Sequence, residues 1–159
     1  MTICVAICSY GYGHLASQAI ESVLSQTRKP DQILLVDDGK HDGITTLGAR
    51  YNIETVIRVK NMGVVDNFND ILFNHVKTDK LLMLGADNYL HPQTLEKLSQ
   101  QDTDITSYDI TLIGTQVDEF RKGLTTEEID GYHIWRFKAG DINQGNFIHG
   151  SSLYDDAKS

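Results

Sequence analysis

Residues 80–90, KLLMLGADNYL, decide how the rest of the chain is interpreted, because an apolar run of strand length ends there in a polar turn. The run from Leu81 to Leu84 is typical of a central strand that is buried on both faces. Asp87 and Asn88 follow just past the strand end, and ligands of open α/β sheets bind beyond the carboxyl ends of the strands. The pair also suits an ordinary turn, so its meaning depends on the remaining sequence.

Strand and helix patterns alternate through the first hundred residues. Apolar, β-rich runs occupy residues 2–8, 33–36, 54–59 and 81–84, while helical spacing covers 14–26, 44–51, 65–76 and the segment after Pro92. Leu24 and Leu72 fall on the apolar sides of their helices. This alternation predicts an α/β fold with a mostly parallel sheet flanked by helices. No linker or repeat divides the chain, so we expect a single domain over residues 1–159.

The pattern changes after residue 101. Residues 104–108 and 110–116 have the composition of strands, and 132–137 alternate like another strand. Residues 117–131 are polar and predict a loop, and 144–158 end in a possible helix. We expect this third of the chain to add strands and loops to the same sheet.

The bulk composition excludes several classes of protein. With 14 basic and 22 acidic residues, the net charge is −8 and no basic cluster is present, which argues against nucleic acid as a partner. No apolar run is long enough to predict a transmembrane segment, and no signal peptide is recognisable, so we expect a cytoplasmic protein. The two cysteines, Cys4 and Cys8, fit a strand's buried face better than a disulfide or a zinc site.

Polar residues stand at the ends of three predicted strands. These are Ser9-Tyr10, Asp37-Asp38 and Asp87-Asn88, and in a doubly wound sheet they line one crevice. A nucleoside suits such a crevice, because its base can stack on an aromatic ring of Tyr10 or Tyr12 while a carboxylate accepts its hydrogen bonds. A carboxylate such as Asp87 suits a divalent cation that neutralises a diphosphate.

At these residues the sequence resembles the inverting glycosyltransferases of family 2, which use nucleotide sugars and have the GT-A fold. The resemblance runs in order along nearly the whole chain and rests on these segments: Cys8-Ser9-Tyr10-Gly11, Ser22-Val23-Leu24-Ser25-Gln26-Thr27, Asp37-Asp38-Gly39-Lys40-His41-Asp42-Gly43, Asn61-Met62-Gly63, Asn67-Phe68-Asn69, Leu84-Gly85-Ala86-Asp87-Asn88 and Gly150-Ser151-Ser152-Leu153-Tyr154. It implies a metal-assisted transfer of sugar from a nucleoside diphosphate sugar to a saccharide or other hydroxyl acceptor.

The resemblance also implies roles for individual residues. The nucleotide-binding residues would be Ser9, Tyr10, Asp37, Asp38, Asn61 and Gly63, with Asp38 and its neighbour Asp37 holding the base. Asp87 would bind Mn²⁺ or Mg²⁺. Two positions depart from the family: Gly85 replaces the first Asp of the metal motif, and Phe68 replaces an Arg that helps to hold the nucleotide. His149 is a candidate for a further metal ligand.

The sequence does not assign the general base to a single residue. An inverting transfer needs a carboxylate to deprotonate the acceptor, and the family's base lies beyond the Ser-Ser-Leu segment. The candidates are Asp155, Asp156, Asp118 and Asp141. The alternative function is a nucleotide-sugar binding module without turnover. A receiver-type signalling domain and a sugar nucleotidylyltransferase fit less well, because the acidic pair follows the second strand, not the first, and no glycine-rich opening followed by Arg is present.

Overall fold

The computed structural model describes residues 1–101 and two strands at 125–129 and 132–136. The chain divides into two compact units, Met1–Asp104 and Ile105–Ser159. The single domain expected over residues 1–159 stays a prediction.

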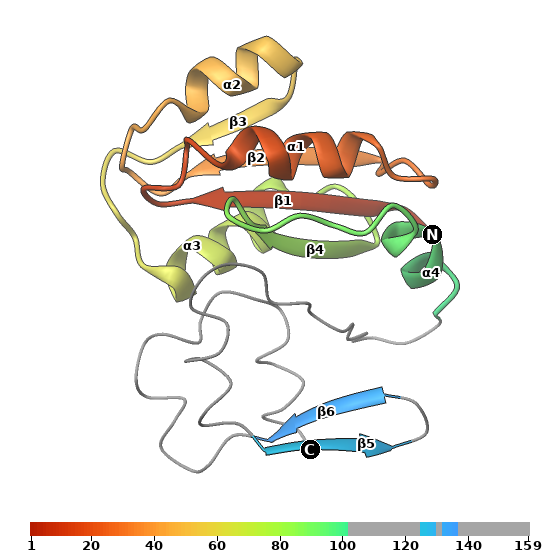
Figure 1. Cartoon of the computed structure of the whole chain (residues 1–159). Helices are drawn as coiled ribbons and strands as arrows, with labels where there is room; N and C mark the ends of the chain where they lie inside the picture. Colours follow the sequence, from red (N-terminus) through yellow and green to blue (C-terminus); the bar gives the residue numbers. More distant parts are fainter. Residues whose placement is uncertain (102–124, 130–131, 137–159) are drawn as a thin grey trace. The chain divides into compact units, whose positions relative to one another are not determined.

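A parallel sheet forms the centre of the first unit (Figure 1). Its strands, in the spatial order β3-β2-β1-β4, are β1 (Ile3–Ser9), β2 (Gln32–Asp37), β3 (Glu54–Ile57) and β4 (Lys80–Gly85). The predicted parallel α/β sheet is therefore confirmed. Among the described strands, β1 lies between its neighbours and is almost wholly buried, whereas β4 stands at the margin, so the described part of the sheet does not show the central position predicted for β4. Leu81 and Met83 of β4 are accordingly only half-buried.

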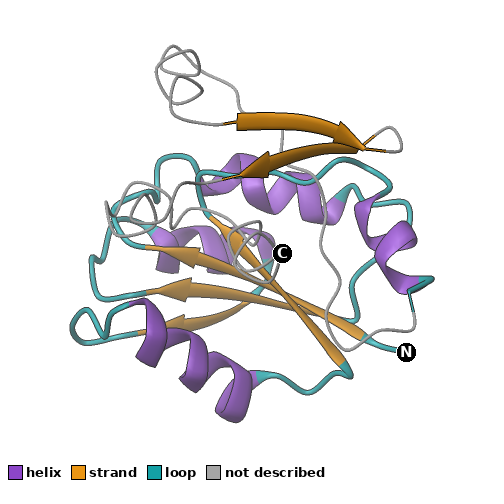
Figure 2. Ribbon diagram, turned by 90° about the horizontal axis from the view of Figure 1, so that it is seen from below, coloured by secondary structure: helices purple, strands orange, loops and turns teal. Residues whose placement is uncertain are grey.

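Helices cover both faces of this sheet (Figure 2). They are α1 (Ala16–Leu24), α2 (Ile44–Tyr51), α3 (Val64–Asp70), the π-helical turn η1 (Ile71–His75) and α4 (Thr94–Ser99). Because side chains alternate along a strand, Cys4, Ala6 and Cys8 share one face of β1. On that face they pack with Ile71 and Phe68 of the α3–η1 segment.

Two leucines at apolar helix positions are more exposed than their spacing predicted. Leu24 is 39% exposed and Leu72 is 47% exposed, whereas their neighbours Val23 and Ile71 are fully buried. Each exposed residue lies at the margin of its helix's buried stripe, where sequence spacing alone cannot assign a side chain to the core or to solvent. Both cysteines pack in the core, as predicted.

Gln26 joins the end of α1 to the start of α4. Its side chain is 1% exposed. Its amide nitrogen donates to the carbonyl oxygens of Ser22 (3.0 Å) and His91 (2.8 Å), and its oxygen accepts from the Leu95 amide (3.0 Å). All of the side chain's polar atoms are engaged, so a buried glutamine is tolerated here.

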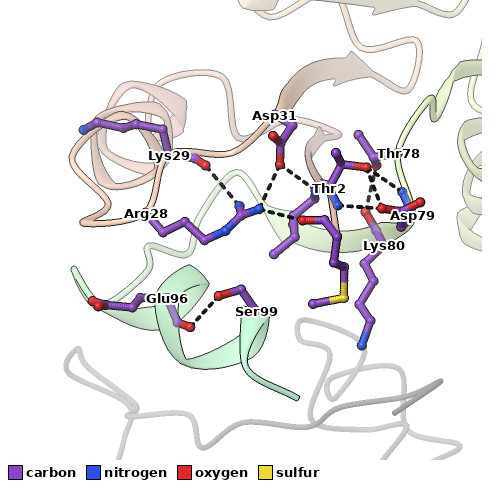
Figure 3. A network of polar contacts seen from close by, with 11 residues as sticks. Thr2, Arg28, Lys29, Asp31, Thr78, Asp79, Lys80, Glu96 and Ser99 are labelled. Atoms are coloured by element: carbon purple, nitrogen blue, oxygen red, sulfur yellow. Dashed lines mark hydrogen bonds and ion pairs between the residues drawn. The ribbon is translucent and has the colours of Figure 1, made fainter. Parts of the chain in front are cut away.

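Carboxylates tie the strands together at the amino end of the sheet (Figure 3). Asp79 accepts hydrogen bonds from the amide (2.6 Å) and the hydroxyl (3.0 Å) of Thr2. Asp31 accepts from the Ile3 amide (2.8 Å) and pairs with Arg28 (3.0 Å). These contacts fix the chain's first residues against β2 and β4.

The second unit contains an antiparallel pair, β5 (Thr125–Ile129) and β6 (Tyr132–Arg136). The strand predicted at 132–137 is confirmed over 132–136, but the loop predicted for 117–131 is wrong where β5 forms. Four of the five residues of β5, TTEEI, are polar, and the pairing with β6 decides their conformation. The strands predicted at 104–108 and 110–116 and the helix predicted within 144–158 lie outside the described residues. In the described part of the chain, no helix has the length and apolar character needed to cross a membrane.

Candidate functional site

The carboxyl ends of β1, β2 and β4 lie side by side. Ser9 of β1 is in register with Asp37 of β2, and Cys8 is in register with Gly85 of β4. The Asp38 amide donates to the Ser9 carbonyl oxygen at 2.9 Å, which extends the β1–β2 pairing past the strand ends. The chain places β2 on one side of β1 and β4 on the other, and ligands of open α/β sheets bind beyond the carboxyl ends of the strands where the strand order reverses in this way.

Asp37 builds the turn that follows β2. It is fully buried, and its two carboxylate oxygens accept hydrogen bonds from the amides of Lys40 and His41 at 2.9 Å each. Asp38 is also buried, with 6% exposure, and its Oδ1 accepts from the Met62 amide at 2.9 Å. No hydrogen bond from a described residue reaches Asp38 Oδ2. Asp38 is thus the member of the pair with an oxygen left for a ligand.

The loop after β3 closes against this turn. Within the loop, the Asn61 side-chain oxygen accepts a hydrogen bond from the Gly63 amide at 2.6 Å, and Gly63 has a φ of +80°. Gly39 has a φ of +83°, and a Cβ at that position would lie 2.7 Å from Lys60 Cα. Only glycine permits this approach of the two backbones.

The loop after β1 is fixed in a similar way. The Gly13 amide donates to Asp42 Oδ2 at 2.8 Å, and a Cβ on Gly13 would lie 2.8 Å from Asp42 Cγ. The Ser9 hydroxyl and Asp42 Oδ1 are buried and have no hydrogen-bond partner among the described residues. Buried polar atoms without partners are unusual in native proteins and mark this end of the sheet.

Tyr10 presents an aromatic face beside the Asp37-Asp38 turn. Its side chain is 50% exposed, and the Lys40 ammonium lies 5.8 Å from the ring centroid. A half-exposed ring at a strand end can stack a planar ligand.

The Cys8 thiol, one residue before Ser9, is not a nucleophile. Burial, followed by the negative charge of Asp38, raises its pKa to about 12. The thiolate, which is the reactive form, is therefore absent at neutral pH.

The fit of a divalent cation depends on Gly85 and Asp87. A Cβ at Gly85 would lie 2.6 Å from Asp87 Oδ1 and 2.7 Å from Asn88 Nδ2, so these side chains occupy the space of the missing first aspartate. The described residues contain no group of three or more His, Cys, Asp or Glu side chains suited to a metal ion. Mg²⁺ in phosphate sites is nevertheless held by one or two carboxylates together with phosphate oxygens and water. The carboxylate of Asp87 is of the ligand type that such a site uses.

The structure places all the predicted nucleotide-binding residues, and Asp87, in the strand ends and loops of this edge. The other candidates, Asp118, Asp141, His149, Asp155 and Asp156, lie outside the described residues. Sequence reasoning assigned no role to Asp42 or Arg58. Asp42 lies in the segment of residues 37–43 that resembles the family, so the resemblance could have indicated it. Arg58 carried no such signal.

Comparisons with known proteins agree with this geometry. The family model described as "Glycosyl transferase family 2" matches residues 4–157. "Bifunctional glycosyltransferase pgtA" of Dictyostelium discoideum is 34% identical over 49% of this chain and 11% of its own length. "Uncharacterized glycosyltransferase alr2836" of a Nostoc strain is 30% identical over 66% of this chain and 34% of its own length. The chain thus spans about a third or less of these relatives.

Solved structures share the fold at low sequence identity. S. aureus TarS 1-349 in complex with UDP-GlcNAc has a TM-score of 0.56 and 15% identity, over 84% of this chain and 37% of that chain. The mannosyltransferase PcManGT from Pyrobaculum calidifontis, in complex with GDP-Man and Mn²⁺, has a TM-score of 0.50 and 18% identity, over 55% of this chain and 28% of that chain.

Proposed function

Because this chain belongs to glycosyltransferase family 2, we propose that it transfers a sugar from a nucleoside diphosphate sugar to a hydroxyl acceptor, with inversion and with the help of Mn²⁺ or Mg²⁺. The observation that carries the proposal is the alignment of the ends of β1, β2 and β4, which puts Tyr10, Asp38 and Asp87 on one edge of the sheet. The acceptor is a saccharide or another hydroxyl compound.

In this proposal the residues of β1 and β2 bind the nucleoside. The base stacks on the exposed face of Tyr10, and Asp38 Oδ2 accepts a hydrogen bond from a base N–H group. Asp37 contributes through the turn it builds, and Asn61 and Gly63 contribute through the loop that supports Asp38. Ser9 lies beneath the nucleoside, where its buried hydroxyl has no described partner.

Asp87 would hold the divalent cation, which neutralises the negative charge of the diphosphate leaving group when it is bound. His149 is a further proposed ligand. The general base is proposed among Asp118, Asp141, Asp155 and Asp156, and its task is to take the proton of the acceptor hydroxyl. A binding module without turnover remains the second candidate, favoured by the glycine at position 85 and the phenylalanine at position 68.

Calorimetry of UDP, GDP and dTDP, each with Mn²⁺ and with EDTA, tests the proposal. We expect the wild type to bind one nucleotide in a metal-dependent way, and Asp87→Ala to lose at least about tenfold in affinity, as expected for a lost charged contact. Asp66→Ala is the matched control, because Asp66 is an exposed carboxylate on α3. Absence of nucleotide binding by the folded wild type would contradict the proposal. Binding without sugar transfer to any hydroxyl acceptor would favour the binding module.

A further inference from the structure

The Arg58 guanidinium spans both ends of the loop between β3 and α3. Its Nε donates to Asn67 Oδ1 at 3.2 Å, and one terminal nitrogen lies 2.5 Å from Asp70 Oδ2 as an ion pair that lacks hydrogen-bond geometry. The Arg58 side chain is 12% exposed, and Asn67 is buried with 3% exposure. One side chain therefore fixes α3, from its middle to its last residue, to the end of β3.

The loop between these anchors has little apolar packing of its own. Val59 is 93% exposed, and Lys60, Asn61 and Met62 are also exposed. Segments with few buried apolar contacts open at low free-energy cost unless polar contacts hold them. The order of residues 59–63 therefore depends on polar contacts at the end of the loop, where the Asn67 backbone amide donates to the Gly63 carbonyl oxygen at 3.0 Å and the Asn67 side chain is held by Arg58.

The same loop supports the proposed base-binding carboxylate. The Met62 amide donates to Asp38 Oδ1, and the Lys60 backbone packs on Gly39. The Arg58 amide in turn donates to the Asp37 carbonyl oxygen at 2.9 Å. These contacts form a closed ring. The Arg58 side chain binds Asn67, the loop before Asn67 binds Asp38, and the Arg58 backbone amide binds the end of β2.

Neighbouring groups keep Asp70 in its role as the partner of Arg58. The Asn74 side-chain nitrogen Nδ2 donates to Asp70 Oδ1 at 2.7 Å, and His75 Nε2 lies 3.1 Å from Oδ2. The hydrogen bond from Asn74, with further contributions from Arg58 and His75, lowers the pKa of Asp70. The carboxylate stays ionised at neutral pH and can hold the guanidinium.

We infer that Arg58 is a positioning residue for nucleotide recognition, which holds the loop of residues 59–63 against Asp38 and so orients the carboxylate that reads the base. The inference rests on the proposed function, because it assumes that a nucleotide base lies against Asp38. Helix α3, VVDNFND, contains no arginine, and the guanidinium that binds it belongs to the residue that follows β3. Arg58 acts through Asp38 and does not touch the base.

The test compares Arg58→Met with Arg28→Met. Arg28 is a matched control, because it is partly buried (25% exposed) and pairs with Asp31 at the opposite end of the same sheet. Both variants should lower the melting temperature. Only Arg58→Met should weaken the preferred nucleotide's binding, by about tenfold, the size of one charged hydrogen bond. It should also narrow the differences in Kd among UDP, GDP and dTDP, measured with Mn²⁺. Arg58→Lys should recover part of both losses, since lysine keeps the charge but not the planar fork.

The outcomes separate this inference from the function on which it rests. If the wild type binds no nucleotide, the proposed function and the inference fall together. If the wild type binds and Arg58→Met keeps both the affinity and the discrimination, the inference alone is overturned. An equal loss in Arg28→Met would overturn it too, because the effect would then be one of general stability. Should Arg58→Met fail to fold, Asp70→Asn, which keeps the shape of the partner and removes its charge, should give the same pattern.

Discussion

The two ends of the parallel sheet use carboxylates to different effect. At the amino end, Asp31 and Asp79 each accept two hydrogen bonds at the single oxygen Oδ2, one from an amide and one from a side-chain donor, and thereby bind strand to strand. At the carboxyl end, Asp38 and Asp42 each accept one described hydrogen bond from a backbone amide, which leaves one oxygen unpaired among the described residues. One oxygen of each carboxylate lacks a described partner at both ends, so the difference between the ends is burial. Asp31 and Asp79 are exposed and water can satisfy them, whereas Asp38 and the Asp42 Oδ1 atom are buried, where only a ligand or ordered water can do so.

Backbone approach distinguishes the two ends as well. The carboxyl-end loops come so close that Gly13 and Gly39 have no room for a side chain. The amino end is joined by long side chains instead, with Arg28 reaching both the Met1 carbonyl oxygen and Asp31. Close backbone contact holds the site in shape without using up its carboxylate oxygens. Changes at the carboxyl end should therefore affect nucleotide binding, and changes at the amino end should affect stability alone.

The largest effect is expected from Gly39→Ala. The new Cβ would meet the backbone at Lys60 and Asn61, and the residue would also have to keep a φ of +83°. The positive φ alone costs about 1–2 kcal/mol, and the backbone clash adds to it. Gly43→Ala is the control, because Gly43 lies in the same loop with a φ of +98° but has nothing within 4 Å of its Cβ position. In urea unfolding, Gly39→Ala should lose clearly more stability than Gly43→Ala, and it should lose nucleotide affinity. Equal losses would show that the loops do not meet.

An intermediate effect is expected from Gln26→Leu at the α1–α4 junction. The leucine keeps the volume but leaves the buried Leu95 amide without its acceptor, while the His91 carbonyl oxygen keeps only the hydrogen bond from the Thr94 amide. Each unsatisfied buried group costs about 1–3 kcal/mol, so the free energy of unfolding should fall by about that amount or more. Nucleotide affinity should stay unchanged, because Gln26 is not among the residues of the carboxyl-end loops. If Gln26→Leu also lost nucleotide affinity, the expected difference between the carboxyl end of the sheet and the rest of the fold would be wrong.

The sequence predicted the sheet well and its order less well. Apolar runs and turn residues located β1, β2, β3 and β4, because both signals are local. The position of β4 at the margin of the described sheet, not at its centre, depends on which strands pair, and no local pattern records that. Strand β5 was missed for a related reason, since its residues carry little apolar periodicity and are paired with β6.

The candidate site divides in the same way. Tyr10, Asp38 and Asp87 could be named from strand ends and from the family resemblance, because both depend on position along the chain. The arrangement around Arg58 could not, since it joins residues nine and more positions apart through a guanidinium whose direction is set only by the folded chain. Likewise, the Gly39–Lys60 approach depends on two loops meeting, although each glycine-containing turn was visible in the sequence.

The smallest effect concerns pH and the amino end alone. Hydrogen bonds from the Ile3 amide and Arg28 lower the pKa of Asp31, and those from the Thr2 amide and hydroxyl lower the pKa of Asp79, both from a usual value of 3.8. A carboxyl group whose pKa is lower in the folded state adds stability above its usual pKa, and that stability disappears as the pH falls through the lowered value. The urea midpoint of the wild type should therefore decline below about pH 4.

The Asp31→Asn/Asp79→Asn double variant should start with a lower urea midpoint at neutral pH, and its midpoint should decline less as the pH falls. The effect is small because both carboxylates are exposed and screened by solvent. A double variant with the same midpoint and the same decline as the wild type would show that these carboxylates do not tie the strands together, and the contrast between the two ends would then rest on the carboxyl end alone.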